Sequence, residues 1–417
     1  MTSSDFRVTL LGTGVPIPSS DRFGPCTLVE AGEQKFLIDA GRGATIRLHQ
    51  LKIPIGRIDV QLLTHYHSDH TSGIPDVWLT GWLQSYFGTR KTPYRVIGPT
   101  GARALMENLE RAYALDIKIR VADEKLPLSG IATDIVEFDR DGVVYEKDGV
   151  TVVAFEVDHG DVIKPCYGYR FEYAGRTAVF SSDTRYNQNV IKYGAGVDLL
   201  VHEVASARPE LMKEAYVQRI IGHHTTPREA GRVFAQAKPK LAAYTHIVLV
   251  GSERIPPPTI DDVLAETRQT YSGPLAVGED LMAFEIGETV TVRRYQLPSA
   301  GNRANVARLA CRPMRLLLRG IRPATRCRPR WLPLALWRGV ISSQSPLLQS
   351  AEMPGRSNGL TGIECTTSIA AISCAGRRLR QPPQRSACWC LAMPHRRQPC
   401  HRRLGGMLGA CGISCRR

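Results

Sequence analysis

Short apolar runs that end at glycine or at acidic turns dominate the first forty residues of the chain. Three such runs cover residues 6–14, 26–31 and 35–41. Runs of this length, rich in β-branched residues and bounded by turn residues, predict a meander of β-strands. Residues 44–53 then repeat apolar positions at helical spacing, which predicts the first helix.

Residues 57–65 form a nearly continuous apolar run, which is typical of a strand buried on both faces. After it, helices and strands alternate in two rounds. We predict helices over residues 75–87, 101–113, 226–237 and 261–271. We predict strands over residues 94–98, 150–157, 167–173, 177–181, 197–204 and 241–246, and another near Val143. A hairpin around Gly287 is predicted to close the domain. Strands first, then alternation, fit two sheets packed face to face with helices outside. The predicted fold class is α/β, a four-layer αββα sandwich.

The composition changes abruptly near residue 300. Residues 301–417 contain 21 Arg and two acidic residues, so they carry a net charge of +19, whereas residues 1–300 carry −4. They also hold nine of the eleven cysteines and no Asp, Lys, Phe or Tyr, although packed cores and mixed-charge surfaces draw on these residues. The missing residue types have A/T-rich codons. We therefore expect one globular domain over residues 1–297 and a disordered tail over 298–417, translated out of frame from GC-rich DNA.

Two functional alternatives for this tail have weaker support. A nucleic-acid-binding arm would group its basic residues on one face or between aromatic residues, but here arginine is scattered among Cys and Pro. A zinc ribbon would need repeated CxxC pairs, and only the CxC of Cys388 and Cys390 stands out.

The front segment, residues 1–300, has just Cys26 and Cys166, no signal-peptide pattern and no membrane-length apolar run. We therefore expect a cytoplasmic location and no membrane association.

The buried strand over 57–65 ends in four side chains of the kinds that bind metal ions. His65, His67, Asp69 and His70 form an HxHxDH motif. A lone histidine there would most often be a core or turn residue, but four ligand types within six residues predict a metal site. In extended chain, residues two apart point the same way, so His65 and His67 can bind one ion. The turn that follows directs Asp69 and His70 towards a second ion.

Three further candidates, His159, Asp183 and His246, lie at the ends of other predicted strands. Metal and catalytic residues typically lie on loops at the ends of a rigid sheet. Imidazole and carboxylate ligands together suit zinc, with manganese or iron as other occupants. The sequence thus predicts a dinuclear centre holding two Zn²⁺ ions.

With this ligand pattern, residues 6–295 resemble the metallo-β-lactamase superfamily. The resemblance implies that His65, His67 and His159 bind one metal, that Asp69, His70 and His246 bind the other, and that Asp183 bridges both. It also implies that Asp39 supports the ligand loop without being a ligand. The implied nucleophile of this hydrolase is a metal-bridging hydroxide, because two close ions lower the pKa of a shared water.

Finer motifs resemble the branch that contains ribonuclease Z and the metallo-type arylsulfatases. These motifs are "LLGTG" near the start, "HEV" at 202–204 and "HHTTPREA" at 223–230. In ribonuclease Z the matching Glu and His form a proton relay, so the resemblance implies that Glu203 orients His224 and that His224 protonates the leaving oxygen. The alternative is that the two residues only brace each other. Asp69, Glu203 and His224 are the catalytic residues that we expect.

We expect the substrate to be a small anionic ester, either an aryl sulfate or a phosphodiester. Asp183 argues against an ordinary β-lactamase, which lacks a bridging aspartate, although β-lactam hydrolysis stays as an alternative. The main alternative is a ribonuclease Z that processes the 3′ end of transfer RNA. Ribonuclease Z commonly inserts an RNA-holding arm before the bridging aspartate, and only 23 residues separate His159 from Asp183. The acidic front segment also suits a polyanion poorly, so nucleic acid is the less favoured partner, and a homodimer is a further expectation.

Aromatic residues follow the metal motif. Trp78, Trp82 and Tyr86 recur every four residues, which is the spacing of one helix face. Core packing is the main interpretation, and an apolar pocket for an aryl group is the alternative. Three arginines could hold an anionic group but are otherwise ordinary surface residues, and none is assigned a role: Arg42, Arg170 and Arg185.

Overall fold

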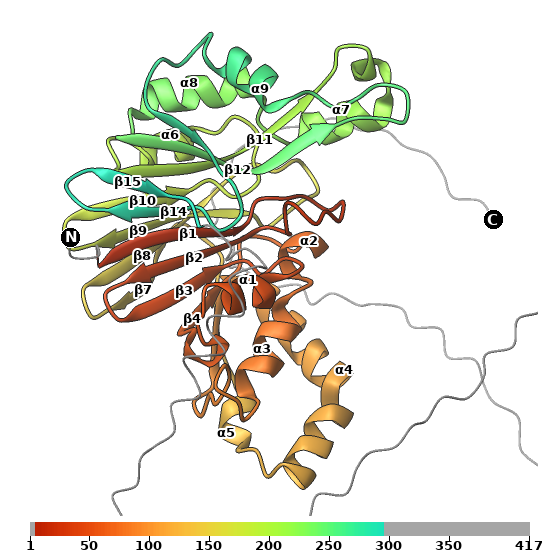
Figure 1. Cartoon of the computed structure of the whole chain (residues 1–417), viewed down its shortest axis with the longest axis vertical. Coiled ribbons are helices and arrows are strands. Elements are labelled where there is room, and N and C mark those ends of the chain that lie inside the picture. The colour runs from red at the N-terminus through yellow and green to blue at the C-terminus, as the bar shows by residue number, and fades with distance from the viewer. Residues whose placement is uncertain (1–4, 296–417) are drawn as a thin grey trace, which may run out of the picture. The chain divides into compact units, whose positions relative to one another are not determined.

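The computed structural model describes residues 5–295 of the chain. The expectations for residues 298–417, the disordered tail and its charge-based alternatives, lie outside these residues. The described part forms two sheets that lie face to face, with helices on the outer side of each (Figure 1).

The first sheet carries the predicted N-terminal meander. Its eight strands are, in spatial order, β15 (Val290–Arg293), β14 (Ala283–Ile286), β1 (Phe6–Gly12), β2 (Cys26–Ala31), β3 (Gln34–Ile38), β4 (Val60–Leu62), β5 (Tyr94–Pro99) and β6 (Thr133–Phe138). Strands β1, β2 and β3 pair antiparallel, whereas β3 to β6 run parallel. Parallel neighbours need crossover connections, and helices supply those between β3 and β6.

The second sheet has seven strands. They are β13 (Leu275–Val277), β12 (Leu241–Val250), β11 (Leu199–Ala207), β10 (Arg176–Phe180), β9 (Tyr167–Tyr173), β8 (Val150–Glu156) and β7 (Gly142–Lys147). Strands β10, β11 and β12 are parallel, and the two antiparallel pairings through β9 give β8 the same direction. The carboxyl ends of β8, β10, β11 and β12 therefore meet at one edge of this sheet.

Aromatic side chains fill the space between the sheets. Phe36 of β3 meets Tyr145 of β7 and Phe171 of β9 edge to face, at ring centroid distances of 5.1 and 5.3 Å. All three rings are buried. Such contacts between the facing sheets hold their strand ends in fixed relative positions.

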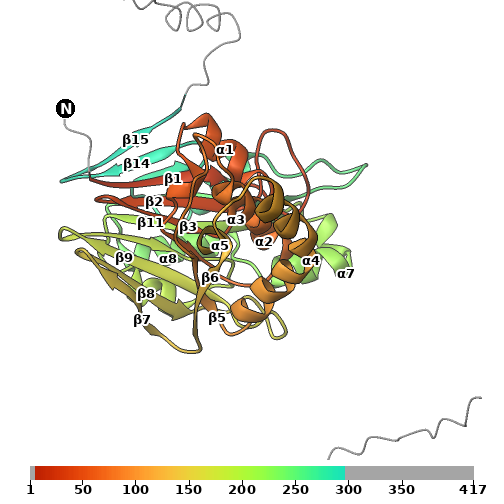
Figure 2. The same cartoon turned by 90° about the horizontal axis from the view of Figure 1, so that it is seen from below.

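Helices cover the outer faces of the sheets. Beside the first sheet lie α1 (Ala44–Gln50), α2 (Ser68–Thr71), α3 (Ile74–Trp82), α4 (Ala102–Asp123) and α5 (Leu128–Ile131), grouped together in Figure 2. Beside the second lie α6 (Gln188–Tyr193), α7 (Ala215–Gly222), α8 (Pro227–Ala237) and α9 (Ile260–Thr267), with two short 3₁₀ helices, η1 (Ile55–Arg57) and η2 (Leu211–Lys213), elsewhere. The predicted αββα architecture is confirmed. No helix within residues 5–295 is long and apolar enough to cross a membrane.

The aromatic helix after the metal motif is shorter than predicted. It ends at Trp82, so Tyr86 leaves the helical face and is 82% exposed. Trp78 and Trp82 are buried, and their indole N–H groups donate to the carbonyls of Ile131 and Pro127 at 2.8 Å. Both indoles are therefore core residues and not walls of a substrate pocket.

Candidate metal centre

The HxHxDH motif is placed by the buried strand β4 and the short helix α2. His65 follows the strand, His67 is the residue before α2, and Asp69 and His70 lie inside that helix. The backbone changes from extended to helical between these two pairs, and the His70 ring still lies 4.2 Å from that of His65, between centroids. His65, Asp69 and His70 are buried.

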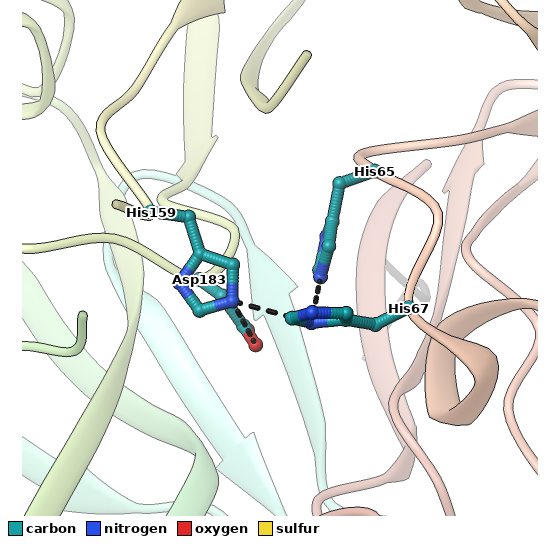
Figure 3. Close-up of side chains that lie close together, drawn as sticks. All are labelled: His65, His67, His159 and Asp183. Atoms are coloured by element: carbon teal, nitrogen blue, oxygen red, sulfur yellow. Dashed lines mark hydrogen bonds and ion pairs between the residues drawn. The ribbon is translucent and has the colours of Figure 1, made fainter. Parts of the chain in front are cut away.

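The first group of ligand atoms consists of His65, His67, His159 and Asp183, whose ligand atoms lie within 4.8 Å of one another (Figure 3). His67 Nδ1 lies 3.0 Å from His65 Nε2 and 3.3 Å from His159 Nε2. His159 Nδ1 donates to the carbonyl of His223 at 2.8 Å, so its Nε2 carries a lone pair. Imidazole nitrogens that face one another at these distances leave room for a shared cation between them.

The second group consists of Asp69, His70 and His246. His246 Nε2 lies 3.3 Å from Asp69 Oδ2, and His70 Nε2 lies 3.6 Å from the same oxygen. The His70 Nε2 atom is fully buried and has no hydrogen-bond partner among the described residues. A buried nitrogen in this state is costly unless something binds it, and a metal ion does so.

Asp183 lies between the two groups. Its Oδ2 is 3.3 Å from both His70 Nε2 and His246 Nε2, and 3.7 Å from His159 Nε2. It follows β10, at the edge where the parallel strands of the second sheet end. The seven side chains singled out from the sequence therefore converge, and the arrangement suits two cations with one shared carboxylate.

Asp39 contacts the ring nitrogen of His70 that points away from the ligand groups. Its carboxylate accepts from His70 Nδ1 at 2.7 Å and from the backbone and hydroxyl groups of Thr64 at 2.9 and 2.8 Å. This bond fixes the His70 ring with Nε2 directed to the site, where an ion would take the place of a proton. Thr64, which the sequence analysis did not select, thereby links Asp39 to the histidine loop.

The site contains backbone conformations that non-glycine residues rarely adopt. Asp39, Ser182 and His246 have φ angles of 57°, 58° and 42°. Such conformations persist only where surrounding contacts impose them, and they concentrate at functional sites. Here Asp39 follows β3 and Ser182 follows β10, whereas His246 lies inside β12, four residues before its end, at the register shift in its pairing with β11.

The protonation states of the first group fit metal binding, whereas nearby carboxylates raise the pKa values of His70 and His246 in the second group, so ions would displace protons there. Burial lowers the pKa of His65 well below its ordinary value and lowers that of His159 to about 3, so both rings are neutral. The pKa of Asp183 is also well below its usual range, because His246 and His70 outweigh the effect of burial. Neutral imidazoles and ionised carboxylates are the forms that coordinate metals.

Glu203 and His224 lie next to the two ligand groups. Glu203 Oε2 is 3.3 Å from His224 Nδ1, and a ring nitrogen of His224 is within 4.8 Å of ligand atoms of Asp183 and His246. Glu203 Oε1 accepts from the backbone amides of Thr225 at 2.7 Å and Thr184 at 3.4 Å. Burial raises the pKa of Glu203 well above its usual value and lowers that of His224 to about 4.

Alternation along β11 separates the residues of the HEV motif. Glu203 faces the site, whereas His202 faces the helices and meets the Phe234 ring of α8 edge to face at 5.8 Å. His223 was not singled out from the sequence, although it directly precedes His224. Its ligand atom lies within 4.8 Å of those of His159 and His224, so it borders the first group.

Comparisons with known proteins agree with this geometry. A family model described as the beta-lactamase superfamily domain matches residues 34–247. Ribonuclease Z of Mycolicibacterium gilvum (strain PYR-GCK) is 34% identical over 283 residues, covering 67% of this chain and 96% of that protein. Ribonuclease Z of Mycobacterium marinum (strain ATCC BAA-535 / M) is 34% identical over 286 residues, covering 67% and 98%.

A solved structure supports the same fold. The metallo-β-lactamase fold protein YhfI from Bacillus subtilis matches with a TM-score of 0.52 at 20% identity, over 67% of this chain and 98% of that one. This likeness shows the fold. The family model and the sequence relatives show that the chain is a metal-dependent hydrolase that belongs to the metallo-β-lactamase superfamily and, within it, to the ribonuclease Z-like branch.

Proposed function

We propose that the chain is an endoribonuclease of the ribonuclease Z type that hydrolyses a phosphodiester bond near the 3′ end of a transfer-RNA precursor. The names of its relatives favour this alternative over the aryl sulfate substrate that we expected from the sequence. The structural observation that carries the proposal is the buried Glu203–His224 pair beside the ligand groups.

The need for a proton donor depends on the leaving group. A ribose oxygen leaves as a strongly basic alkoxide, so its departure is accelerated by an acid within hydrogen-bond reach. A nitrophenolate or another aryl oxide is stable enough to leave without one. A histidine placed to donate a proton therefore suits cleavage of a nucleic-acid backbone better than cleavage of an aryl ester.

The residues divide the work as follows. The seven ligands would hold two divalent cations, and zinc is the proposed metal. When bound, such ions lower the pKa of water and neutralise the negative charge on phosphate oxygens. Asp69 serves the catalytic centre as a ligand. Glu203, whose pKa burial raises, would give a proton to Nδ1 of His224, while His224 gives the proton on its other nitrogen to the leaving oxygen. Thr225 and Thr184 fix Glu203 through their backbone amides.

A small phosphodiester is the second candidate substrate. Only β9 and β10, with their connecting turns, lie between His159 and Asp183, so no long RNA-holding arm is inserted there. Residues 1–300 also carry a net charge of −4, which gives weak attraction for a polyanion.

The deciding experiment measures metal-dependent cleavage of precursor transfer RNA, bis-nitrophenyl phosphate and nitrophenyl sulfate by zinc-loaded protein, each with and without a chelator. Chelator-sensitive cleavage of the RNA at one site supports the proposal. Hydrolysis of the phosphodiester with no RNA cleavage would replace it with the second candidate, and turnover of the sulfate alone would restore the original expectation.

His224→Ala tests the proton donor within this experiment. We expect RNA cleavage to fall by about a hundredfold or more, a typical contribution of general acid catalysis, while hydrolysis of bis-nitrophenyl phosphate falls by less than about tenfold. Metal content, measured by mass spectrometry, should stay at two equivalents. Equal losses on both substrates would leave only the bracing interpretation of Glu203 and His224.

A further inference from the structure

We propose that Arg185 is a positioning residue that fixes the turn carrying His224 against the loop carrying His159, and so sets the orientation of the proton donor. The inference rests on the proposed function, because it concerns how that reaction is served. Arg185 lies two residues after Asp183, in the connection that leaves the metal site.

Arg185 makes its best side-chain contact with the end of helix α7. Its Nε donates to the carbonyl of Gly222, the last residue of that helix, at 2.9 Å. Carbonyls at a helix C-terminus lack partners within the helix, and a cationic donor there is favourable. The next two residues along the chain are His223 and His224.

The other side of Arg185 is tied to the loop that carries His159. Its backbone amide donates to the carbonyl of Asp158 at 2.7 Å. Its guanidinium lies 3.5 Å from the Asp158 carboxylate and 3.4 Å from that of Asp161. The Asp161 side chain is 91% exposed, so this last pair contributes little, and the inner contacts matter more.

His159 binds the same turn one residue further along. Its Nδ1 donates to the carbonyl of His223 at 2.8 Å. Two consecutive carbonyls, those of Gly222 and His223, are therefore held by Arg185 and by a metal-ligand candidate. The packing is close, because a Cβ added to Gly160 would lie 3.3 Å from His223 Cβ and 3.6 Å from an Arg185 guanidinium nitrogen.

The turn has few other restraints on this side. The backbone bonds that close it are long, 3.4 Å from His223 N to Ile220 O and 3.2 Å from His224 N to Ile221 O. Beyond His224, the Thr225 amide donates to Glu203 at 2.7 Å. Glu203 and Arg185 thus hold the backbone of the turn on either side of His224, whose ring also packs 4.9 Å from that of His159 and 5.6 Å from that of His246. Loss of Arg185 loosens the turn and so shifts the His224 ring from its orientation.

Arg185→Met tests this role, with Arg185→Lys as the conservative variant. Arg170→Met is the matched control, since Arg170 of β9 also binds a carboxylate, that of Glu172 at 2.7 Å, and a carbonyl at the end of a helix, that of Tyr193 of α6 at 2.6 Å. We expect Arg185→Met to lower kcat for RNA by about tenfold to a hundredfold, the usual range for residues that orient catalytic groups, and to lower that for bis-nitrophenyl phosphate less than threefold. Arg185→Lys should recover part of the loss, and metal content should not change.

Hydrogen exchange of the zinc-loaded protein gives a readout that does not need activity. The amides of residues 222–226 should exchange faster in Arg185→Met than in the wild-type protein, and not in Arg170→Met. If KM alone rises in Arg185→Met and hydrogen exchange is unchanged, Arg185 binds substrate. If the variant loses zinc, Arg185 supports His159 as a ligand. Either result overturns the inference. If the wild-type protein cleaves no substrate, the proposed function fails, while the exchange comparison still decides the role of Arg185.

Discussion

Hydrogen bonds to one nitrogen of an imidazole decide which nitrogen is left for a metal. His70 gives its Nδ1 proton to Asp39, and His159 gives its own to the His223 carbonyl. His65 Nδ1 lies 3.0 Å from the Thr64 hydroxyl, which itself donates to Asp39. The rings of His65 and His159 therefore present an unprotonated Nε2 to the site before any ion arrives, which reduces the reorganisation that binding requires. For His70, the carboxylates of Asp183 and Asp39 outweigh burial and raise the pKa of the ring, so an ion displaces a proton there.

His67→Ala removes the nitrogen that lies between His65 and His159. We expect the protein to lose one of two zinc equivalents and activity to fall by about a thousandfold or more, because the reaction depends on both ions. Elemental analysis and turnover of the preferred substrate measure this. His49→Ala, at an exposed ring whose centroid lies 4.5 Å from that of Phe87, is the control. Full zinc content in His67→Ala would contradict the ligand assignment.

His202 gives a pH dependence that is independent of metal binding. Burial lowers its pKa to about 4, against 6.5 in the unfolded chain. Between pH 6.5 and 4 the unfolded state therefore binds a proton that the folded state does not, so folding stability is lost as the pH falls through this window, by up to about 3 kcal/mol. Urea unfolding of chelator-treated protein at pH 4.5 and 7 should show a smaller difference for His202→Gln than for the wild type. Equal differences would rule out the contribution.

At the scale of elements, the prediction from sequence succeeded where the periodicity was strong. Helix α8 was expected over 226–237 and begins at Pro227, behind a capping box between Thr226 and Glu229. Strand β6 was missed, because Thr133–Phe138 lies at a sheet edge with no fully buried residue and so lacks a clear apolar pattern. Helix α4 continues to Asp123, ten residues beyond the predicted end at Tyr113, since no breaker interrupts it.

The candidate site was predictable to a similar degree. Its ligands could be found because HxHxDH and single His or Asp residues at strand ends are visible in sequence. Of the residues that orient them, Asp39 followed from the family resemblance, but Thr64, His223 and Arg185 have no local pattern that assigns them this role. Their roles depend on which carbonyl or carboxylate the fold brings near, and only the packing of the two sheets determines that.

Asp280 joins helix α1 to two loop residues, Thr13 after β1 and Phe23 before β2. Its carboxylate accepts from the Thr13 amide and hydroxyl at 2.9 and 2.8 Å, from the Phe23 amide at 2.8 Å and from Arg47 of α1 at 2.8 Å. The side chains of Arg47 and Asp280 are only 8% and 5% exposed. Asp280→Ala would leave a buried cation unpaired, so we expect a loss of about 3 to 5 kcal/mol in the free energy of unfolding.

A double-mutant cycle measures the same pair. Denaturant unfolding of Asp280→Ala, Arg47→Met and the double variant should show that the double variant is more stable than the sum of the single losses predicts, because it buries no unpaired charge. Additive losses would mean that Asp280 acts through its bonds to Thr13 and Phe23 alone.

At the scale of the whole molecule, the chain divides by charge. Residues 1–300 carry −4 and contain the complete set of site residues, while residues 301–417 carry +19. We propose that residues 1–297 suffice for catalysis. A version of the chain ending at Leu297 should keep two zinc equivalents and a kcat within about threefold of the full chain, because no site residue lies beyond His246.

Salt dependence separates catalysis from attraction by charge. A segment with this arginine content binds RNA by counterion release, and each neutralised phosphate steepens the dependence of log K on log salt by about 0.7 for single strands. Retention of unrelated RNA by the full chain should therefore fall steeply between low and high salt, and the shortened chain should retain little at any salt concentration. Site-specific cleavage of precursor transfer RNA should persist in the shortened chain. If cleavage disappears with residues 298–417 while zinc and phosphodiester hydrolysis remain, that segment is a functional RNA-binding arm and the out-of-frame interpretation is wrong.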